Sequence, residues 1–339
     1  MTLFITDSEC KQLITIETAI PVVEEAFRHA GEGRAENPPR TRMPIAFKEP
    51  RYEGYLQLGG AAIAPQKVAG FKLFSNFGKP VSGRQYGRTW NFLFSLETGE
   101  LLAIIQAHAV GIIRTSAVSG AAVKHLSRPD ATVAGLYGAG TYAEGQLAAV
   151  CAVRPIKKAY VYSRTPEKRE AFCRAVSARL GIEMIPATQA EQPAREAEVV
   201  VTMTNSFSPV LCGEWLSRPG LVVAAGANHW YRREIDSKLV EMATLLAVDG
   251  MDVAKVESGA ILRAVAEGRR SWGQVEEFGR VVAGHVAIPD FGAGTILFAS
   301  HGLSLIDVAV SARVYELARA KGMGREIDLE GEWRARDHS

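Results

Sequence analysis

The sequence predicts an α/β protein in which a doubly wound parallel sheet is combined with a discontinuous α+β domain. After residue 114, apolar strand-like runs alternate with helical segments, as expected for a parallel sheet that is covered by helices on both faces. A glycine-rich turn joins the first of these strands to the next helix. Before residue 114, strand-like runs follow one another through short turns, which is typical of an antiparallel meander.

Length and composition indicate an ordinary globular protein with two domains. The chain has 339 residues, which is more than one hydrophobic core usually holds. Hydrophobic residues make up 47% of the chain, a normal share for a folded protein. The net charge is +2 and no run of lysine and arginine occurs, so we expect no nucleic-acid partner.

Cysteine spacing and apolar runs indicate a cytoplasmic protein. The four cysteines lack the spacing of metal ligands, so we expect buried free thiols and no metal site. The N-terminal residues lack the pattern of a signal peptide. No apolar run reaches the roughly 20 residues of a membrane helix, so we expect no membrane partner.

The first domain is expected to begin with a helix and to continue as a sheet. Apolar residues recur at helical spacing from Ala19 to Ala30, Thr15 or Thr18 provides an N-cap, and Gly31 ends the helix. The strand-like runs that follow are Tyr55–Leu58, Val68–Phe74, Trp90–Ser95 and Leu101–Gln106. A turn at 97–100 joins the last two runs as a hairpin.

The second domain is expected to alternate strands and helices. It opens with the alanine-rich helix Ala117–Leu126. The expected strands are Thr132–Tyr137, Ala159–Tyr162, Glu183–Ile185, Val199–Met203, Leu221–Ala225 and Leu245–Val248, with helices at Ala143–Val153 and Glu167–Leu180. The amphipathic helix Ser304–Lys321 is expected to return to the first domain. The predicted division is therefore residues 1–114 and 302–339 for one domain and 115–301 for the other.

The glycine-rich turn predicts a dinucleotide site of the Rossmann type. Its residues are Gly138, Ala139, Gly140, Thr141 and Tyr142, and they lie between an apolar strand and the helix that begins at Ala143. Gly138 permits the tight turn, and Gly140 lets backbone N–H groups approach a pyrophosphate at the helix N-terminus. The alternative interpretation is a structural glycine turn in another kind of α/β protein.

The end of the second strand indicates the cofactor. An NAD site usually has an acidic residue there, which accepts hydrogen bonds from the ribose. This sequence has Ser163, Arg164 and Thr165 instead, and Lys168 follows one turn later. Arginine and hydroxyl groups bind a 2′-phosphate, so the pattern favours NADP(H) over NAD(H). Alternatively, Arg164 stacks on the adenine and the protein uses either cofactor.

Three isolated cations are candidates for binding an anionic substrate. Lys72 lies in an apolar, strand-like run, Arg114 lies where the first domain passes into the second, and Arg40 follows two prolines. A guanidinium group can bind a carboxylate through two hydrogen bonds. Each cation has an open alternative as a structural ion-pair partner.

The sequence resembles the ornithine cyclodeaminase/μ-crystallin family over nearly its whole length. The segments that carry the resemblance are Pro39-Arg40-Thr41, the Lys72 strand, Arg114–Ser119, the turn at Gly138, Ser163–Thr165, Gly213–Leu216 with Pro219-Gly220, Gly226–Asn228, Arg233–Asp236 and Thr295–Gly302 with Asp307. They occur in the order in which the family has them.

The resemblance implies a dimeric Rossmann enzyme that acts on a small amino or imino acid. It implies that Arg40, Lys72 and Arg114 bind the substrate carboxylate and that Asp236 is the acid/base group at the reacting nitrogen, with Lys72 in the catalytic group. It also places Asn228, Ser300 and His301 near the nicotinamide. Proton donation to nitrogen assists hydride transfer to a C=N bond, which agrees with a carboxyl group at that place.

Several positions depart from the family pattern. Gln57 occupies the place where cyclodeaminases have a glutamate, and Gly59-Gly60 replaces a Met-Pro pair. Gly87-Arg88 replaces His-Gln, and Trp90 is bulky. His229 begins an unusual turn, His229-Trp230-Tyr231, and is either a substrate contact or a plain loop residue.

These observations lead to one main hypothesis and two alternatives. The main hypothesis is an NADP(H)-dependent reductase of a small imino acid or ketimine, or the reverse oxidation of the amino acid. A glutamine cannot act as a base, so Gln57 counts against the first alternative, an ammonia-releasing amino-acid cyclodeaminase. The second alternative is a non-catalytic NADP(H)-dependent binding protein.

Overall fold

A computed structural model describes residues 1–47, 52–77 and 86–329. The chain forms two compact units. Unit 1 comprises Met1–Val22, Gly33–Arg114 and Leu303–Ser339, and unit 2 comprises Val23–Glu32 and Thr115–Gly302. The last ten residues of the predicted segment 302–339 lie outside the described residues.

Unit 1 is built on a mainly antiparallel sheet. Its strands run in the order β16-β1-β7-β6-β5-β4-β2, and β3 pairs with β4. Their bounds are β1 Thr2–Ile5, β2 Ala35–Glu36, β3 Thr41–Phe47, β4 Tyr52–Ile63, β5 Val68–Phe77, β6 Tyr86–Ser95, β7 Leu101–Gln106 and β16 Arg325–Ile327. Four of these strands were predicted. The short β1, β2 and β16, and β3, were not.

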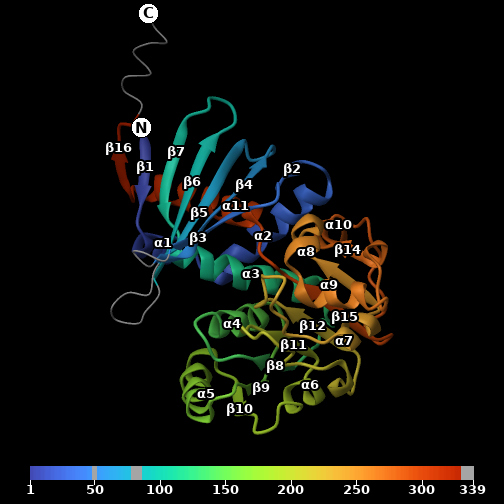
Figure 1. Ribbon diagram of the computed structural model, residues 1–339. Helices are drawn as coiled ribbons and strands as arrows, with labels where there is room; N and C mark the ends of the chain where they lie inside the picture. Colours follow the sequence, from blue (N-terminus) through green and yellow to red (C-terminus); the bar gives the residue numbers. More distant parts are fainter. Residues whose placement is uncertain (48–51, 78–85, 330–339) are drawn as a thin grey trace, which may run out of the picture. The chain divides into compact units, whose positions relative to one another are not determined.

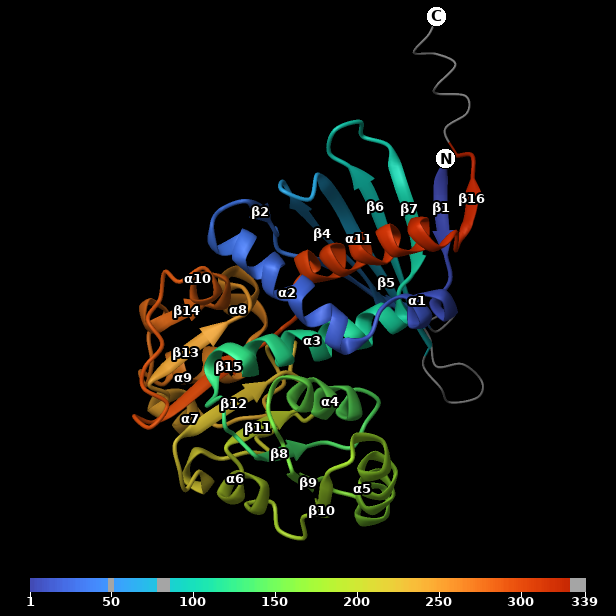
Figure 2. The same cartoon turned by 180° about the vertical axis from the view of Figure 1, so that it is seen from behind.

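Helix α11 (Ser304–Lys321) covers one face of this sheet (Figure 2). It packs on β4, β5 and β6. This agrees with the prediction that the segment returns to the first domain. The prediction of a simple amphipathic helix was wrong. Every residue from Ser304 to Ala312 is buried, so the first half of α11 has no exposed polar face.

Helix α3 (His108–Leu126) begins nine residues before the predicted start at Ala117. The added turns contain Gly111, Ile112 and Ile113, which are weak helix formers. Arg114 therefore lies within a helix, at the place where unit 1 passes into unit 2. The other helices of this part of the chain are α1 (Asp7–Leu13) and α2 (Ile16–Gly31).

Unit 2 contains a wholly parallel sheet (Figure 1). The strand order is β10-β9-β8-β11-β12-β15-β13-β14. The bounds are β8 Val133–Tyr137, β9 Lys158–Tyr162, β10 Glu183–Pro186, β11 Val199–Thr202, β12 Gly220–Ala224, β13 Leu245–Val248, β14 Val275–Glu277 and β15 Thr295–Ala299. The chain winds away from β8 in both directions, which confirms the predicted doubly wound sheet and makes the end of β8 its topological switch point.

The helices of unit 2 follow its strands. They are α4 Ala143–Val153, α5 Pro166–Leu180, α6 Gln192–Glu196, α7 Ser237–Met242, α8 Met251–Glu257, α9 Gly259–Ala266 and α10 Phe278–Val282. All residues of β11, β13 and β15 are buried, as the continuous apolar runs predicted for the first two. No helix in the described part of the chain combines the length and apolar character needed to span a membrane.

Candidate active site

Lys72 and Arg114 share one carboxylate oxygen in unit 1. Lys72 Nζ and Arg114 Nε each lie 3.1 Å from Asp307 Oδ1. The side chains of the two cations are 12% exposed and that of Asp307 is 4% exposed. Strand β5, helix α3 and helix α11 supply the three residues. One carboxylate opposite two buried cations leaves positive charge that a second carboxylate can neutralise.

The pKa of Lys72 reflects this environment. The pKa is lowered to about 8, chiefly by burial, and the negative charge of Asp307 opposes that effect. The positive charges of Arg114 and Arg40 contribute to the lowering. Arg40 is close enough to Lys72 for its charge to affect the pKa of the lysine. The structure therefore brings all three predicted cations together.

Gly59 explains how α11 reaches this cluster. Gly59 pairs with Lys72 across β4 and β5. A Cβ atom at Gly59 would collide with Ser304 Oγ and would lie 3.1 Å from the Cβ of Arg40. The absence of a side chain at Gly59 therefore allows the first turn of α11 to approach the sheet, one turn before Asp307.

Gln57 is engaged by a neighbouring arginine. Arg42 Nε donates a hydrogen bond of 2.7 Å to Gln57 Oε1, because the two residues pair across β3 and β4. Of the other departures from the family pattern, Trp90 is half-buried on β6 and Arg88 is exposed.

In unit 2, the glycine turn lies at the carboxyl end of β8. Gly138 has φ +116°, and a Cβ there would collide with the carbonyl oxygen of Met203, so only glycine fits without strain. A Cβ at Gly140 would meet no atom of the described chain within 4 Å. Gly140 therefore leaves open space beside the start of α4, as a pyrophosphate requires. Ala139, Thr141 and Tyr142 complete the turn.

The end of β9 presents Ser163, Arg164 and Thr165. Ser163 is half-buried, and Arg164 and Thr165 are exposed. Arg169 is buried beneath them, where its Nη1 donates to the Ser163 carbonyl oxygen at 2.7 Å. Arg169 therefore fixes the backbone of this loop. No pattern in the sequence indicated this role.

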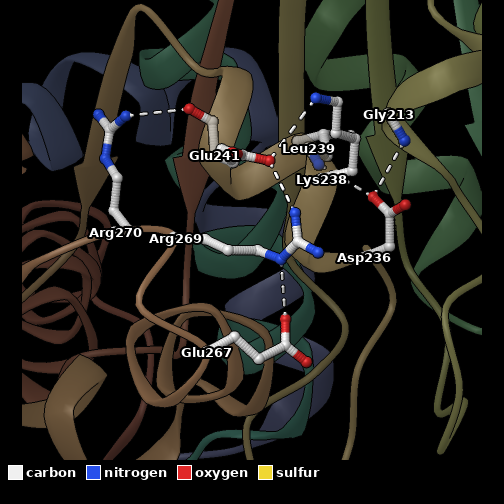
Figure 3. A network of polar contacts seen from close by, with 8 residues as sticks. All are labelled: Gly213, Asp236, Lys238, Leu239, Glu241, Glu267, Arg269 and Arg270. Atoms are coloured by element: carbon white, nitrogen blue, oxygen red, sulfur yellow. Dashed lines mark hydrogen bonds and ion pairs between the residues drawn. The ribbon is translucent and has the colours of Figure 1, made fainter.

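Asp236 caps helix α7. Its Oδ1 accepts hydrogen bonds of 3.0 Å from the backbone N–H groups of Gly213 and Leu239 (Figure 3). This is a structural role that the sequence analysis did not assign to Asp236. Its role as an acid/base group stays a prediction.

Glu234 joins the loops that follow β11 and β12. Its buried carboxylate accepts from the backbone N–H groups of Thr204 at 2.5 Å, Gly226 at 2.7 Å and Ala227 at 3.0 Å. Burial raises the pKa of this carboxyl group, while the hydrogen bonds oppose that effect. In the sequence, Glu234 was noted only as part of the family segment Arg233–Asp236. Gly226 and Ala227 lie eight and seven residues before Glu234, and Thr204 lies 30 residues before it, so no helix or strand periodicity could identify these partners.

The remaining predicted cofactor residues also lie at the carboxyl edge of the sheet. Asn228 follows β12, and its Oδ1 is 2.8 Å from His229 Nδ1. Ser300 and His301 follow β15, and both are buried. Asp249, at the end of β13, accepts from Ser300 Oγ at 2.9 Å and from the His301 backbone N–H at 2.8 Å. Asp249, which the sequence analysis did not identify, thus fixes this turn.

These features define the class. Unit 2 has a Rossmann-type fold with a glycine turn at the end of β8, and unit 1 carries a buried cation cluster that suits a small carboxylate. The chain belongs to the ornithine cyclodeaminase/mu-crystallin family, which it matches over residues 1–322.

Named relatives match almost the whole chain. A Delta(1)-pyrroline-2-carboxylate reductase of Bacillus cereus is 29% identical over 334 residues, covering 96% of this chain and 100% of the relative. The alanine dehydrogenase of Archaeoglobus fulgidus is 32% identical over 339 residues, covering 96% and 98%. The structure of Thermococcus litoralis Delta(1)-pyrroline-2-carboxylate reductase in complex with NADH and L-proline has a TM-score of 0.89 and 29% identity, covering 96% and 100%.

Proposed function

We propose that this protein is an NAD(P)H-dependent oxidoreductase that reduces the C=N bond of a small imino acid or ketimine, or reversibly oxidises the corresponding amino acid. The observation that carries the proposal is the buried pair of Lys72 and Arg114 on a single carboxylate. In this proposal unit 1 is the substrate-binding and dimerisation domain, and unit 2 is the NADP(H)-binding domain. The activities in the names of the relatives support the reaction class.

The chemistry divides between the two units. Arg40, Lys72 and Arg114 bind the substrate carboxylate, as the family resemblance implies, and the positive charge of Lys72 and Arg114 exceeds what Asp307 neutralises. Gly138, Gly140, Asn228, Ser300 and His301 belong to the part of unit 2 that holds the coenzyme, which supplies or accepts the hydride when bound. Reduction forms a C–H bond at the imine carbon and an N–H bond at nitrogen, so one residue has to deliver a proton.

We assign that proton to Asp236, and substitutions can separate this role from helix capping. Asparagine is a good N-cap residue, so Asp236→Asn should keep the melting temperature and lower kcat by about 100-fold or more. Asp236→Ala should lower both quantities. Full turnover in the Asp236→Asn protein would assign the proton to another group, and Lys72, with its pKa of about 8, is then the next to examine.

We further propose a preference for NADPH, which rests on Ser163, Arg164 and Thr165. In contrast, the Thermococcus litoralis structure contains NADH. We expect kcat/KM to be higher with NADPH than with NADH. Arg164→Ala should raise KM for NADPH about tenfold and leave KM for NADH nearly unchanged, since the guanidinium group contacts only the added phosphate. An equal effect on both coenzymes would indicate that Arg164 stacks on the adenine.

The reaction itself is tested by following coenzyme oxidation with mixtures of 2-oxo acids and ammonia or methylamine. We expect coenzyme oxidation that depends on both components and is lost in Lys72→Met. Ammonia release from ornithine without net coenzyme turnover would instead identify a cyclodeaminase, a reaction that Gln57 disfavours. Coenzyme binding without turnover of any substrate would identify a binding protein.

A further inference from the structure

An exposed aromatic cluster lies on two loops of unit 2. Phe207 belongs to the loop after β11, and Trp230 and Tyr231 belong to the loop after β12. The three residues are 64%, 68% and 42% exposed, respectively. Large aromatic residues are costly to leave in water, and a group of them at one place marks a binding surface more often than chance exposure.

The rings are organised against one another. Phe207 and Tyr231 stack at 5.9 Å with an interplanar angle of 19°, and Trp230 meets Tyr231 edge-on at 5.5 Å. The guanidinium group of Arg232 lies 5.6 Å from the centre of the Phe207 ring and 5.8 Å from that of Tyr231. Stacking and cation–π contacts of this kind fix ring orientations.

The backbone beneath these rings is also fixed. Arg233 N–H donates to the Ser206 carbonyl oxygen, which ties the two loops together. Glu234 binds the start of both loops through Thr204 and Gly226. Gly259, the first residue of α9, lies so close to the carbonyl oxygens of Trp230 and Arg232 that a Cβ there would collide with them. The aromatic side chains are therefore presented on a rigid base, which lowers the entropic cost of binding.

Sheet topology places this cluster at the nicotinamide end of the dinucleotide site. The turn for the pyrophosphate follows β8, and the loop for the adenosine follows β9. On the other side of β8 the strand order continues with β11 and β12, and the nicotinamide half of a bound dinucleotide would lie over the ends of these strands. These are the strands whose loops carry the aromatic residues.

From this placement we propose that Phe207, Trp230 and Tyr231 form a subsite for the substrate side chain and select imino acids with an aromatic side chain. The inference rests on the proposed function, because hydride transfer requires the imine carbon to touch the nicotinamide. The side chain attached to that carbon must then lie at the same edge of the sheet. An aromatic side chain would cover the apolar surface that these rings expose.

The test compares phenylpyruvate with pyruvate, each with methylamine and saturating NADPH. Wild-type protein should show a kcat/KM at least about tenfold higher for phenylpyruvate, the effect of burying one ring. Trp230→Ala should reduce that ratio at least about tenfold, and Trp230→Phe should retain most of it. Val256→Ala removes an exposed apolar side chain of α8 and should leave the ratio unchanged.

Three results would overturn the subsite. They are a wild-type preference for pyruvate, an equal loss for both substrates in Trp230→Ala, and a change of oligomeric mass in that variant, which would show that a second copy covers the rings. If neither acid is reduced with NADPH or NADH, the proposed function fails separately. Calorimetric titration then tests the subsite separately. If the subsite exists, phenylpyruvate binds more tightly than pyruvate, and Trp230→Ala abolishes the difference.

Discussion

At the scale of single residues, the buried carboxylate of Asp307 forms ion pairs with Lys72 and Arg114. These two cations were selected from the sequence independently of each other. Lys72 and Arg114 were candidates because each stands alone in an apolar context, where a solvated charge would be unusual. Asp307 was noted only as part of a family pattern. The structure shows that its negative charge sustains the charge of Lys72 against burial. The three residues are therefore electrostatically coupled, and changes to one member should alter the others.

The pKa of Lys72 gives a first prediction. Binding of a substrate carboxylate requires the protonated amine, whose pKa is about 8. We expect kcat/KM to be constant at lower pH and to fall as pH rises through about 8, because the ammonium group loses its proton. Lys72→Arg should remove this fall, since arginine stays charged over the whole range. An unchanged alkaline limb in Lys72→Arg would show that another group titrates.

Asp307→Asn gives a second prediction. Loss of the carboxylate leaves two buried cations without a counter-charge, and we expect the free energy of unfolding to fall by about 3–5 kcal/mol. The pKa of Lys72 should also fall, which would move the alkaline limb of kcat/KM to lower pH. Asp130→Asn breaks an exposed ion pair with Arg128 and is the control, with little expected change in urea denaturation. Equal stability of the two variants would contradict this account.

The same scale shows what the sequence could not reveal. Asp236 was identified from family resemblance, but its capping role depends on the start of α7, a helix of six residues with too little periodicity to predict. The role of Glu234 depends on backbone groups at the start of its own loop and of the loop after β11. Single residues in apolar surroundings could be recognised, whereas partnerships created by tertiary folding could not.

At the scale of elements, predictions succeeded where local pattern and burial agree. Helix α4 was predicted with its observed bounds, because an apolar run follows the glycine turn directly. Strand β15 was not predicted as a strand, although it lies in the middle of the sheet. It is the last strand of this sheet along the chain, but it lies between β12 and β13. Only the folded topology reveals that position.

The turn between β8 and α4 allows a matched pair of substitutions. Gly140→Val should leave the melting temperature nearly unchanged, because its Cβ meets no atom of the described chain within 4 Å. It should weaken NADPH binding at least about tenfold, since the side chain fills the space for the pyrophosphate. Gly138→Val should instead destabilise the protein by about 1–3 kcal/mol or more, because of its positive φ and the collision with Met203. Fluorescence titration and thermal denaturation measure the two effects, and tight NADPH binding by Gly140→Val would exclude this turn as the phosphate site.

At the scale of the whole molecule, the sheet of unit 1 carries apolar residues on the face opposite α11 as well. Lys72 points to the face that α11 covers, so its neighbours Phe71 and Leu73 point to the other face. Phe71 pairs with Phe92 and stacks on it at 4.6 Å, and Leu73 pairs with Leu58 on β4. Apolar residues on both faces of an antiparallel sheet indicate that a second layer covers it.

We expect a second copy of the chain to provide that layer. Light scattering should give a mass about twice the 36.7 kDa of one chain. Leu58 is 45% exposed in the single chain, so Leu58→Glu should preserve the fold and the circular dichroism spectrum. A carboxylate placed in an apolar interface costs several kcal/mol, and the variant should therefore dissociate to monomers at micromolar concentration. Val256→Glu alters an exposed residue of unit 2 and should remain dimeric. A monomeric wild-type protein, or a Leu58→Glu protein that stays dimeric, would mean that this face is not the interface.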